Sequence, residues 1–264
     1  MQWIKPMLAT AGNAVPQGQY AYEVKWDGIR TILAVSDRIQ LYSRSGRDIS
    51  SQFPELATAQ LQPGVYDGEI YCLRDGKPDL GTVIQKLNAN TPNFDRANCC
   101  LFDRLAIDGK RITSQPWYDR RESLEDGFND HPNYHLSELF QDGENLLEGI
   151  RKMKMEGIMS KRIDGRYIPG RRSNAWIKNK IKKSMKCYIV NHTEGRGIRK
   201  NSFGSLHLTD DAGQYIGRVG TGFDYGTIAI ICDRLQSEDA IPCKIQYTYK
   251  TERGLREPVF LNLS

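Results

Sequence analysis

Near its start the sequence has a lysine followed closely by an aspartate, a glycine and an arginine, in "YEVKWDGIR" at residues 22–30. The amine of Lys25 could belong to a solvated strand edge or to a nucleophile, and this stretch alone favours the solvated edge. Further charged residues recur beside glycines at the ends of strand-like segments. They are Asp27, Arg30, Arg44, Asp67, Glu69, Asp103, Glu156, Lys161, Lys178 and Lys180. Basic and acidic groups side by side suit a triphosphate with a divalent metal, because cations meet phosphate oxygens and carboxylates hold the metal.

The charges are spread unevenly along the chain. The net charge is +5 at pH 7, yet residues 151–186 contain thirteen lysines and arginines against two acidic residues. That segment carries +11 and the rest of the chain −6. A basic stretch can be a solvated face, but it also suits a polyanionic partner, because lysine and arginine displace counterions from phosphates.

Other patterns argue against several kinds of protein. No apolar run approaches 18 residues, and the chain does not begin with a basic stretch followed by an apolar one. We therefore expect a cytoplasmic protein without a membrane span or secretory signal. The six cysteines form no CxxC pair, and we expect reduced core thiols. His131 and His135 have Pro132 between them and no HExxH pattern, so we do not expect a metal site there.

The pattern of apolar residues predicts an α+β protein of two domains. Alternating residues at 21–46, a hairpin turning at Asp75-Gly76 and a buried strand at 98–109 predict a largely antiparallel sheet. Helices are predicted at 53–62, 80–89, 117–128 and 144–155. Beyond residue 184, five short strand-like stretches with a helical insert between the third and fourth predict a small OB-type barrel. We therefore place the domains at 1–184 and 185–264.

Together, the charged stretches resemble the ordered motifs of covalent nucleotidyltransferases, namely polynucleotide ligases and mRNA capping enzymes. "KWDGIR" resembles their KxDGxR motif, and the others follow in the family's order: "DGEI" (67–70), "LFD" (101–103), "EGIMSKR" (156–162) and "WIKNK" (176–180). "PMLAT", "YIPGRRSNAWIK" and "GRVGTGF" narrow the resemblance to ATP-dependent DNA ligases, both the minimal bacterial and phage enzymes and the ligase module of bacterial end-joining enzymes. This resemblance covers nearly the whole chain. It implies an antiparallel-sheet, ATP-grasp-like nucleotidyltransferase domain followed by an OB-fold.

By this resemblance, Lys25 is the nucleophile that takes AMP from ATP. Lysine is protonated in water at neutral pH, so we expect nearby cations and a bound metal to favour the free amine. The residues implied to bind ATP or AMP are Glu23 at the adenine amino group, Phe102 and Met159 on the adenine faces, Arg30 and Glu69 at the ribose, Arg44 near the nucleotide or nick phosphate, and Lys161, Lys178 and Lys180 at the phosphates. Mg²⁺ (or Mn²⁺) is implied at Glu156, Asp27 and Glu69, with Asp103 in support.

The remaining basic residues are assigned to DNA. Those expected to hold its phosphates are Arg44, Arg171, Arg172, Arg196, Arg199 and Arg218. The family's last motif is incomplete, because the sequence ends in "LREPVFLNLS" and leaves Arg253 and Arg256 as candidate equivalents.

We therefore predict a monomeric ATP-dependent DNA ligase. It would seal nicks between a 5′-phosphate and a 3′-hydroxyl in duplex DNA, through lysyl-AMP at Lys25 and a DNA-adenylate. Two alternatives stay open. One is an RNA ligase or capping-type guanylyltransferase, which Glu156-Gly157 disfavours because capping enzymes usually have Asp-Gly there. The other is a non-catalytic OB-type nucleic-acid-binding protein that keeps a decayed pocket.

Overall fold

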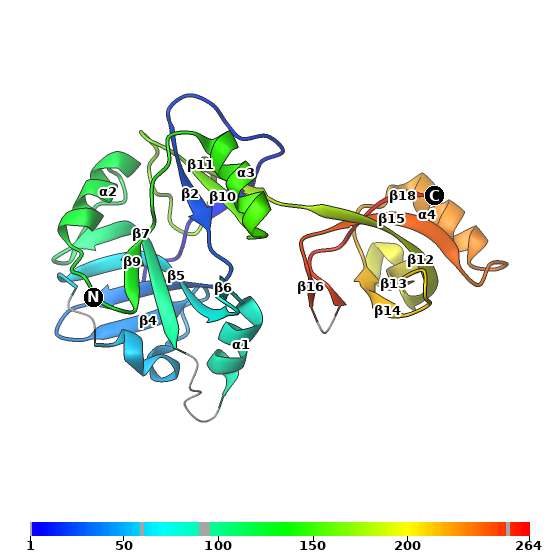
Figure 1. Cartoon of the computed structure of the whole chain (residues 1–264), viewed down its shortest axis with the longest axis horizontal. Coiled ribbons are helices and arrows are strands. Elements are labelled where there is room, and N and C mark those ends of the chain that lie inside the picture. Colours follow the sequence, from blue (N-terminus) through cyan, green and yellow to red (C-terminus); the bar gives the residue numbers. More distant parts are fainter. Residues whose placement is uncertain (1, 59–60, 90–95, 252–253) are drawn as a thin grey trace. The chain divides into compact units, whose positions relative to one another are not determined.

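The computed structural model describes residues 2–58, 61–89, 96–251 and 254–264. The chain forms two compact units, Met1–Lys180 and Ile181–Ser264 (Figure 1). The sequence places the boundary after residue 184, and the structure divides the chain between Lys180 and Ile181. No helix in the described ranges is long and apolar enough to span a membrane.

The larger sheet of the first unit has seven strands among the described residues. Its main path runs β4 (Ile39–Ser43), β3 (Ile29–Val35), β5 (Gly64–Arg74), β7 (Ala97–Ile107) and β8 (Lys110–Arg111), while β6 (Lys77–Pro78) pairs with β5 and β9 (Tyr134–Leu136) with β7. Every pairing is antiparallel except that of β7 with β9. The predicted turn at Asp75-Gly76 is confirmed, because both residues adopt the positive φ angles that such a hairpin requires.

A second sheet supplies the other half of this unit. Its strands lie in the order β1 (Leu8–Ala11), β11 (Arg172–Lys180), β10 (Gly157–Arg162) and β2 (Tyr20–Lys25). Helix α3 (Gly143–Met153) packs against β10 and β2, and it starts where the side chain of Asp142 accepts a hydrogen bond from the Asn145 amide.

The two faces of the larger sheet bury different sets of side chains, because neighbouring strand residues point in opposite directions. Leu33 and Tyr66 belong to one core, on the side covered by the helices. Ile32 and Val65 belong to another core, which includes Trp176 of the smaller sheet. The second core therefore lies between the two sheets, and side chains on its rim are held from both sides.

Two of the predicted helices are present, as α1 (Leu80–Asn88) and α2 (Trp117–Asp126), and they contact β5 and β7 respectively. Of the helix expected at 53–62, the described residues contain only the 3-10 turn Pro54–Leu56, which follows another 3-10 turn at Ser50–Gln52. The second turn has no side-chain cap at its start, which leaves its first amides without the partners that a longer helix needs.

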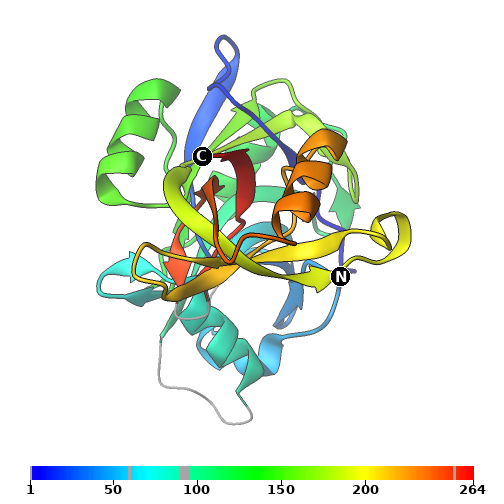
Figure 2. The same ribbon diagram turned by 90° about the vertical axis from the view of Figure 1, so that its right-hand side faces the viewer.

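The second unit is built around a five-stranded antiparallel sheet. Its order is β14 (Tyr215–Val219), β13 (Phe203–Thr209), β12 (Lys183–Glu194), β15 (Ile241–Tyr247) and β18 (Val259–Leu263), with the small hairpin β16 (Lys250–Thr251) and β17 (Gly254–Leu255) beside it. Helix α4 (Tyr225–Arg234), orange in Figure 1, buries Ile231 in the core of this sheet. Figure 2 shows the C-terminus on β18, in dark red. The predicted five strands, with a helix between the third and the fourth, are confirmed.

Candidate active site

The smaller sheet aligns several charged side chains that could take part in the chemistry in rows across its strands. Lys25 lies opposite Gly157 of β10, and Gly157 lies opposite Lys180 of β11. The next row on the same face consists of Glu23, Met159 and Lys178. Because side chains two apart on a strand share a face, these residues line the same side of the sheet as Trp176.

Gly157 allows the three strands to approach at this point. Its φ is +153°, and a Cβ there would lie 2.2 Å from the carbonyl oxygen of Asn179. Any other residue would push β10 away from β11 and separate Lys25 from Lys180.

The carboxylate of Glu156 joins the two lysines of the first row. Its Oε2 lies 2.5 Å from Lys25 Nζ, and its Oε1 lies 3.0 Å from Lys180 Nζ. Glu156 is 7% exposed, whereas Lys25 keeps 21% of its side chain accessible. The Lys25 amine is therefore oriented by a buried carboxylate and remains open to a ligand.

Glu69 of the larger sheet faces this cluster and is strongly perturbed. Burial raises its pKa to about 7, partly opposed by Lys25 and Arg30 and reinforced by the negative charge of Glu156. The ionised form of Glu69 is therefore unfavourable in the absence of a ligand. A cation or hydroxyl groups placed beside it would stabilise the carboxylate. This fits the expected role of Glu69 next to a nucleotide or a metal.

Arg30 is held in a fixed orientation between the two sheets. It donates two hydrogen bonds, of 2.5 and 2.6 Å, to the fully buried carboxylate of Asp67, which also accepts one of 2.6 Å from the Tyr167 hydroxyl. The guanidinium lies over the rings of Phe102 and Trp176, at 4.7 and 5.3 Å from their centroids. Asp67 therefore occupies two of the donors of Arg30, whose predicted partner is a ribose hydroxyl.

Lys161 differs from the other lysines of the predicted phosphate group. It is 1% exposed, forms an ion pair of 2.8 Å with Glu23 and donates a 2.9 Å hydrogen bond to the Phe102 carbonyl. The rings of Phe102 and Trp176 lie within 4.6 Å of its ammonium. Burial lowers the pKa of Lys161, and the neighbouring Glu23 opposes that shift. This environment fits a positioning role for Lys161, because the Glu23 carboxylate and the Phe102 carbonyl already take two of its three donors.

Asp103, expected to support a metal, is paired within the protein instead. Its two oxygens each accept a 2.8 Å hydrogen bond from Arg120 of α2, and both side chains are fully buried. In the described ranges no three side chains of the histidine, cysteine, aspartate and glutamate types gather as a ready metal site. Glu156, Glu69 and the half-buried Asp27 stay predicted ligands, and any metal would need substrate oxygens to complete its coordination.

The residues assigned to DNA are mostly at the surface. Arg44, Arg171, Arg172, Arg196 and Arg218 are exposed, and so is Arg256, a candidate equivalent of the family's last motif. Arg172 donates to the Ala9 carbonyl, and Arg199 donates a 3.1 Å hydrogen bond to the Gly220 carbonyl. Arg253 lies outside the described residues.

The sequence did not predict three side chains that contact the predicted site residues: Trp176, Tyr167 and Arg120. Trp176 could have been found, because it stands two and four residues before Lys178 and Lys180 and so shares their face. Tyr167 and Arg120 lie in segments without a strand pattern near the motifs. Only the packing between the sheets brings them to Asp67 and Asp103.

Comparison with known proteins gives consistent matches. The family described as "ATP dependent DNA ligase domain" matches residues 6–180. The multifunctional non-homologous end joining protein LigD of Mycolicibacterium smegmatis is 33% identical over 242 residues, which cover 88% of this chain and 31% of that protein. DNA ligase C1 of the same species is 31% identical over 241 residues, covering 81% and 67%. A solved structure, mycobacterial DNA ligase D complexed with ATP and MES, aligns with a TM-score of 0.62 at 28% identity, covering 99% and 95%. The chain thus spans about a third of the end-joining relative.

Proposed function

The chain belongs to the family of ATP-dependent DNA ligase domains, and we propose that it seals nicks in duplex DNA through an AMP adduct on Lys25. The observation that carries this proposal is the Lys25 amine, partly open to solvent and oriented by Glu156 at the rim between the two sheets. A basic group, Lys180, lies on the other side of the same carboxylate.

The reaction has three balanced steps. The free amine of Lys25 attacks the α-phosphorus of ATP; a P–N bond forms, the bond to pyrophosphate breaks and the amine loses a proton. The 5′-phosphate at a nick then attacks the lysyl-AMP; the P–N bond breaks, the Lys25 amine regains a proton and AMP moves to DNA. Finally the adjacent 3′-hydroxyl loses its proton as it attacks the adenylated 5′-phosphate; a phosphodiester forms, the phosphoanhydride bond breaks and AMP leaves. Glu156 holds the amine in position, and Lys180 lies where it can meet phosphate oxygens.

The charges of the site suit Mg²⁺ bound together with the triphosphate. Glu69 and Glu156 repel each other strongly enough to contribute to the raised pKa of Glu69, and a divalent cation near them would relieve that repulsion. We therefore assign Glu156 and Glu69, with Asp27, as the groups that would hold it. When bound, such an ion would offset the negative charge of the reacting phosphates.

We infer nucleotide recognition from the row of Glu23, Met159 and Lys178 and from the aromatic side chains near it. Glu23 is 2% exposed and paired with Lys161, so it presents a fixed carboxylate beside Met159. Phe102 lies against the same lysine. We propose that adenine binds between Phe102 and Met159 with its amino group at Glu23, and that Lys178 and Lys180 serve the phosphates.

We propose that the second unit is an OB-type barrel that contacts DNA. Its strand order and the helix between the third and fourth strands support this assignment. The sheet also curves back on itself, because the Phe260 amide of β18 donates a 2.9 Å hydrogen bond to the Thr221 carbonyl just after β14. Exposed arginines such as Arg196 and Arg218 supply positive charge for phosphates.

Intact-protein mass spectrometry tests the first step. Incubation of the full chain with ATP and Mg²⁺ should add the mass of one AMP, and Lys25→Ala should abolish this gain. Lys110→Ala, which changes an exposed lysine in β8, is the matched control and should be adenylated normally. An adduct that survives in Lys25→Ala would overturn the assignment.

A nicked, labelled duplex tests the remaining steps. Sealing with ATP, but not with NAD or without nucleotide, is the expected result. Labelling by GTP, or sealing of RNA nicks alone, would instead support a guanylyltransferase or an RNA ligase. Duplex binding without any adduct would support a binding protein with a decayed pocket.

A further inference from the structure

The connection between β12 and β13 presents an apolar side chain to solvent. Ile198 lies in the 3-10 turn Gly197–Arg199 and is 95% exposed, more than any other large hydrophobic side chain in the described ranges. Isolated exposed apolar residues are common, but so complete an exposure at a loop tip marks a candidate contact for a partner.

The loop around Ile198, residues 195–202, is held by its own hydrogen bonds. The Gly195 amide donates to the Ser202 carbonyl at 3.0 Å, and the Ser202 amide donates to the Arg199 carbonyl at 2.9 Å. Arg199 also ties the loop to the Gly220 carbonyl. A Cβ at Gly195 would lie 1.9 Å from the Arg199 carbonyl oxygen, so only glycine allows this close turn. Ile198 is thus displayed by an ordered turn, which reduces the entropy lost when it binds.

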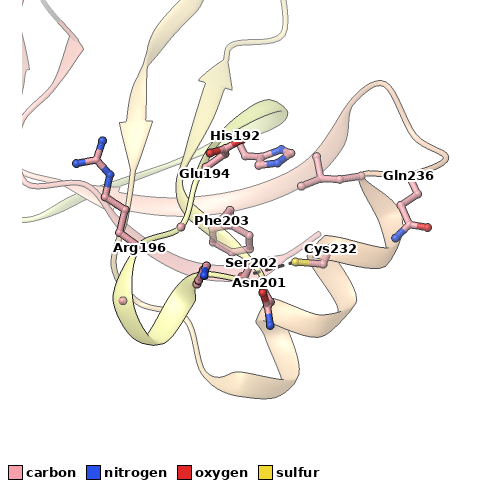
Figure 3. A pocket seen from close by; sticks show the side chains of 12 residues that line it. His192, Glu194, Arg196, Asn201, Ser202, Phe203, Cys232 and Gln236 are labelled. Atoms are coloured by element: carbon pink, nitrogen blue, oxygen red, sulfur yellow. Dashed lines mark hydrogen bonds between the residues drawn. The ribbon is translucent and has the colours of Figure 1, made fainter.

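A pocket of about 760 Å³ lies between the loop and α4, which also meet directly where the Ser202 hydroxyl and the Cys232 thiol form a 3.7 Å hydrogen bond (Figure 3). Its wall includes Arg196 and Lys200 of the loop, Glu194 of β12 and Cys232 of α4, but not Ile198. Figure 3 shows Arg196 extending outward from the loop, away from Ser202 and Cys232. The apolar tip therefore lies open to solvent, outside the pocket.

The charge around the tip selects the partner. Arg196 and Lys200 flank Ile198 within two residues on either side, and both are exposed. Glu194 is the nearest acidic residue in the sequence and lies at the base of the loop. An apolar tip between cations matches the way proteins enter the minor groove of DNA, where basic groups hold the phosphates and an aliphatic side chain presses against base edges.

We propose that loop 195–202 is a minor-groove wedge, in which Ile198 contacts the bases and sugars of the duplex while Arg196 and Lys200 hold the flanking phosphates. This inference rests on the proposed DNA substrate, and it assigns to Ile198 a positioning role in holding the nicked duplex. A docking site for another protein, or for the first unit, is the alternative that the experiment must separate from it.

Binding of the full chain to a nicked duplex, measured by fluorescence anisotropy from 50 to 200 mM salt, tests the wedge. Ile198→Ala should weaken binding about fivefold to tenfold through lost apolar contact, with an unchanged slope of log Kd against log salt concentration. Arg196→Ala should instead reduce that slope by about one. Ile230→Ala on α4, a half-exposed isoleucine outside the loop, is the matched control and should bind as the wild type.

A second readout reports on the bases themselves. With 2-aminopurine placed near the nick, wild-type protein should raise the fluorescence by unstacking the base, and Ile198→Ala should lose this rise. Wild-type DNA affinity in Ile198→Ala overturns the wedge. A loss of self-adenylation by ATP in Ile198→Ala, with DNA affinity intact, overturns it in favour of docking on the first unit. If the wild type itself gains no AMP, the proposed function fails; normal sealing by both proteins refutes the wedge alone.

Discussion

Replacing Glu69 by glutamine should stabilise the first unit, and more so at high pH. Burial raises the pKa of Glu69 from an ordinary 4.5 to about 7, although Lys25 and Arg30 partly oppose the change. Between these two values the native state binds the Glu69 proton more tightly than the unfolded chain does. The free energy of unfolding of the wild type therefore falls as pH rises through this window, and the glutamine variant lacks that loss.

The size of the effect follows from the same two values. The rise in the pKa of Glu69 from 4.5 to about 7 should make the glutamine variant about 3 kcal/mol more stable than the wild type at pH 8. Each tenfold change in proton affinity is worth about 1.4 kcal/mol. At pH 5, where the site is largely protonated in the native state, the difference is about 1 kcal/mol. Partial access of solvent to Glu69 makes both numbers upper values.

Urea unfolding at pH 5 and pH 8 measures this difference. All four tryptophans, Trp3, Trp26, Trp117 and Trp176, lie in the first unit, so intrinsic fluorescence reports on it directly. Glu138→Gln, which changes an exposed glutamate, is the control and should follow the wild type at both pH values. A Glu69→Gln variant with the same stability gain at both pH values, or one destabilised at pH 8, would refute the reasoning.

Three further substitutions test the other contacts of the site. Lys161→Met should destabilise the first unit by about 3 to 5 kcal/mol in urea unfolding, because it leaves the Glu23 carboxylate buried without its cation, and adding Glu23→Gln should recover most of the loss. Gly157→Ala should slow adenylation and lower stability by more than about 1 kcal/mol, because its Cβ would meet the Asn179 carbonyl at a positive φ; a variant with wild-type melting temperature would contradict this. Lys180→Ala should reduce the rate of AMP incorporation about tenfold to a hundredfold, whereas an unchanged rate would remove this lysine from the phosphate site.

Local periodicity explains why so much of the fold could be predicted. The alternation in β3 and β5 and the five strands of the second unit depend on residues close in sequence, and all of these strands occur. The same spacing rule places Lys178 and Lys180 on one face of β11. The helix predicted at 53–62 failed because helix length depends on caps and packing as well as on apolar pattern.

Pairing between distant charges could not be predicted in the same way. Asp103 looks like a metal ligand at the end of "LFD", but Arg120 of α2 occupies both of its oxygens. Lys161 is predicted to bind phosphates, and its ion pair with Glu23, formed through the pairing of β10 with β2, could not be foreseen. Both outcomes depend on which strands and helices become neighbours. A motif read in isolation contains no information on that point.

The buried charges of the site fall into two kinds with different consequences. Two hydrogen bonds join Arg30 to Asp67, and two more join Arg120 to Asp103. In each pair, both carboxylate oxygens therefore already have a partner within the protein. In the group formed by Lys25, Glu156 and Lys180, two cations instead share one carboxylate at the open rim, and Glu69 lies close enough to interact with Lys25. In the proposed reaction, phosphate oxygens of ATP would replace Glu156 as partners of these lysines, and the carboxylate would become available to a divalent cation. The doubly bonded pairs then hold β3 to β5 and α2 to β7, while the group of Lys25, Glu156 and Lys180 exchanges its partners when the triphosphate binds.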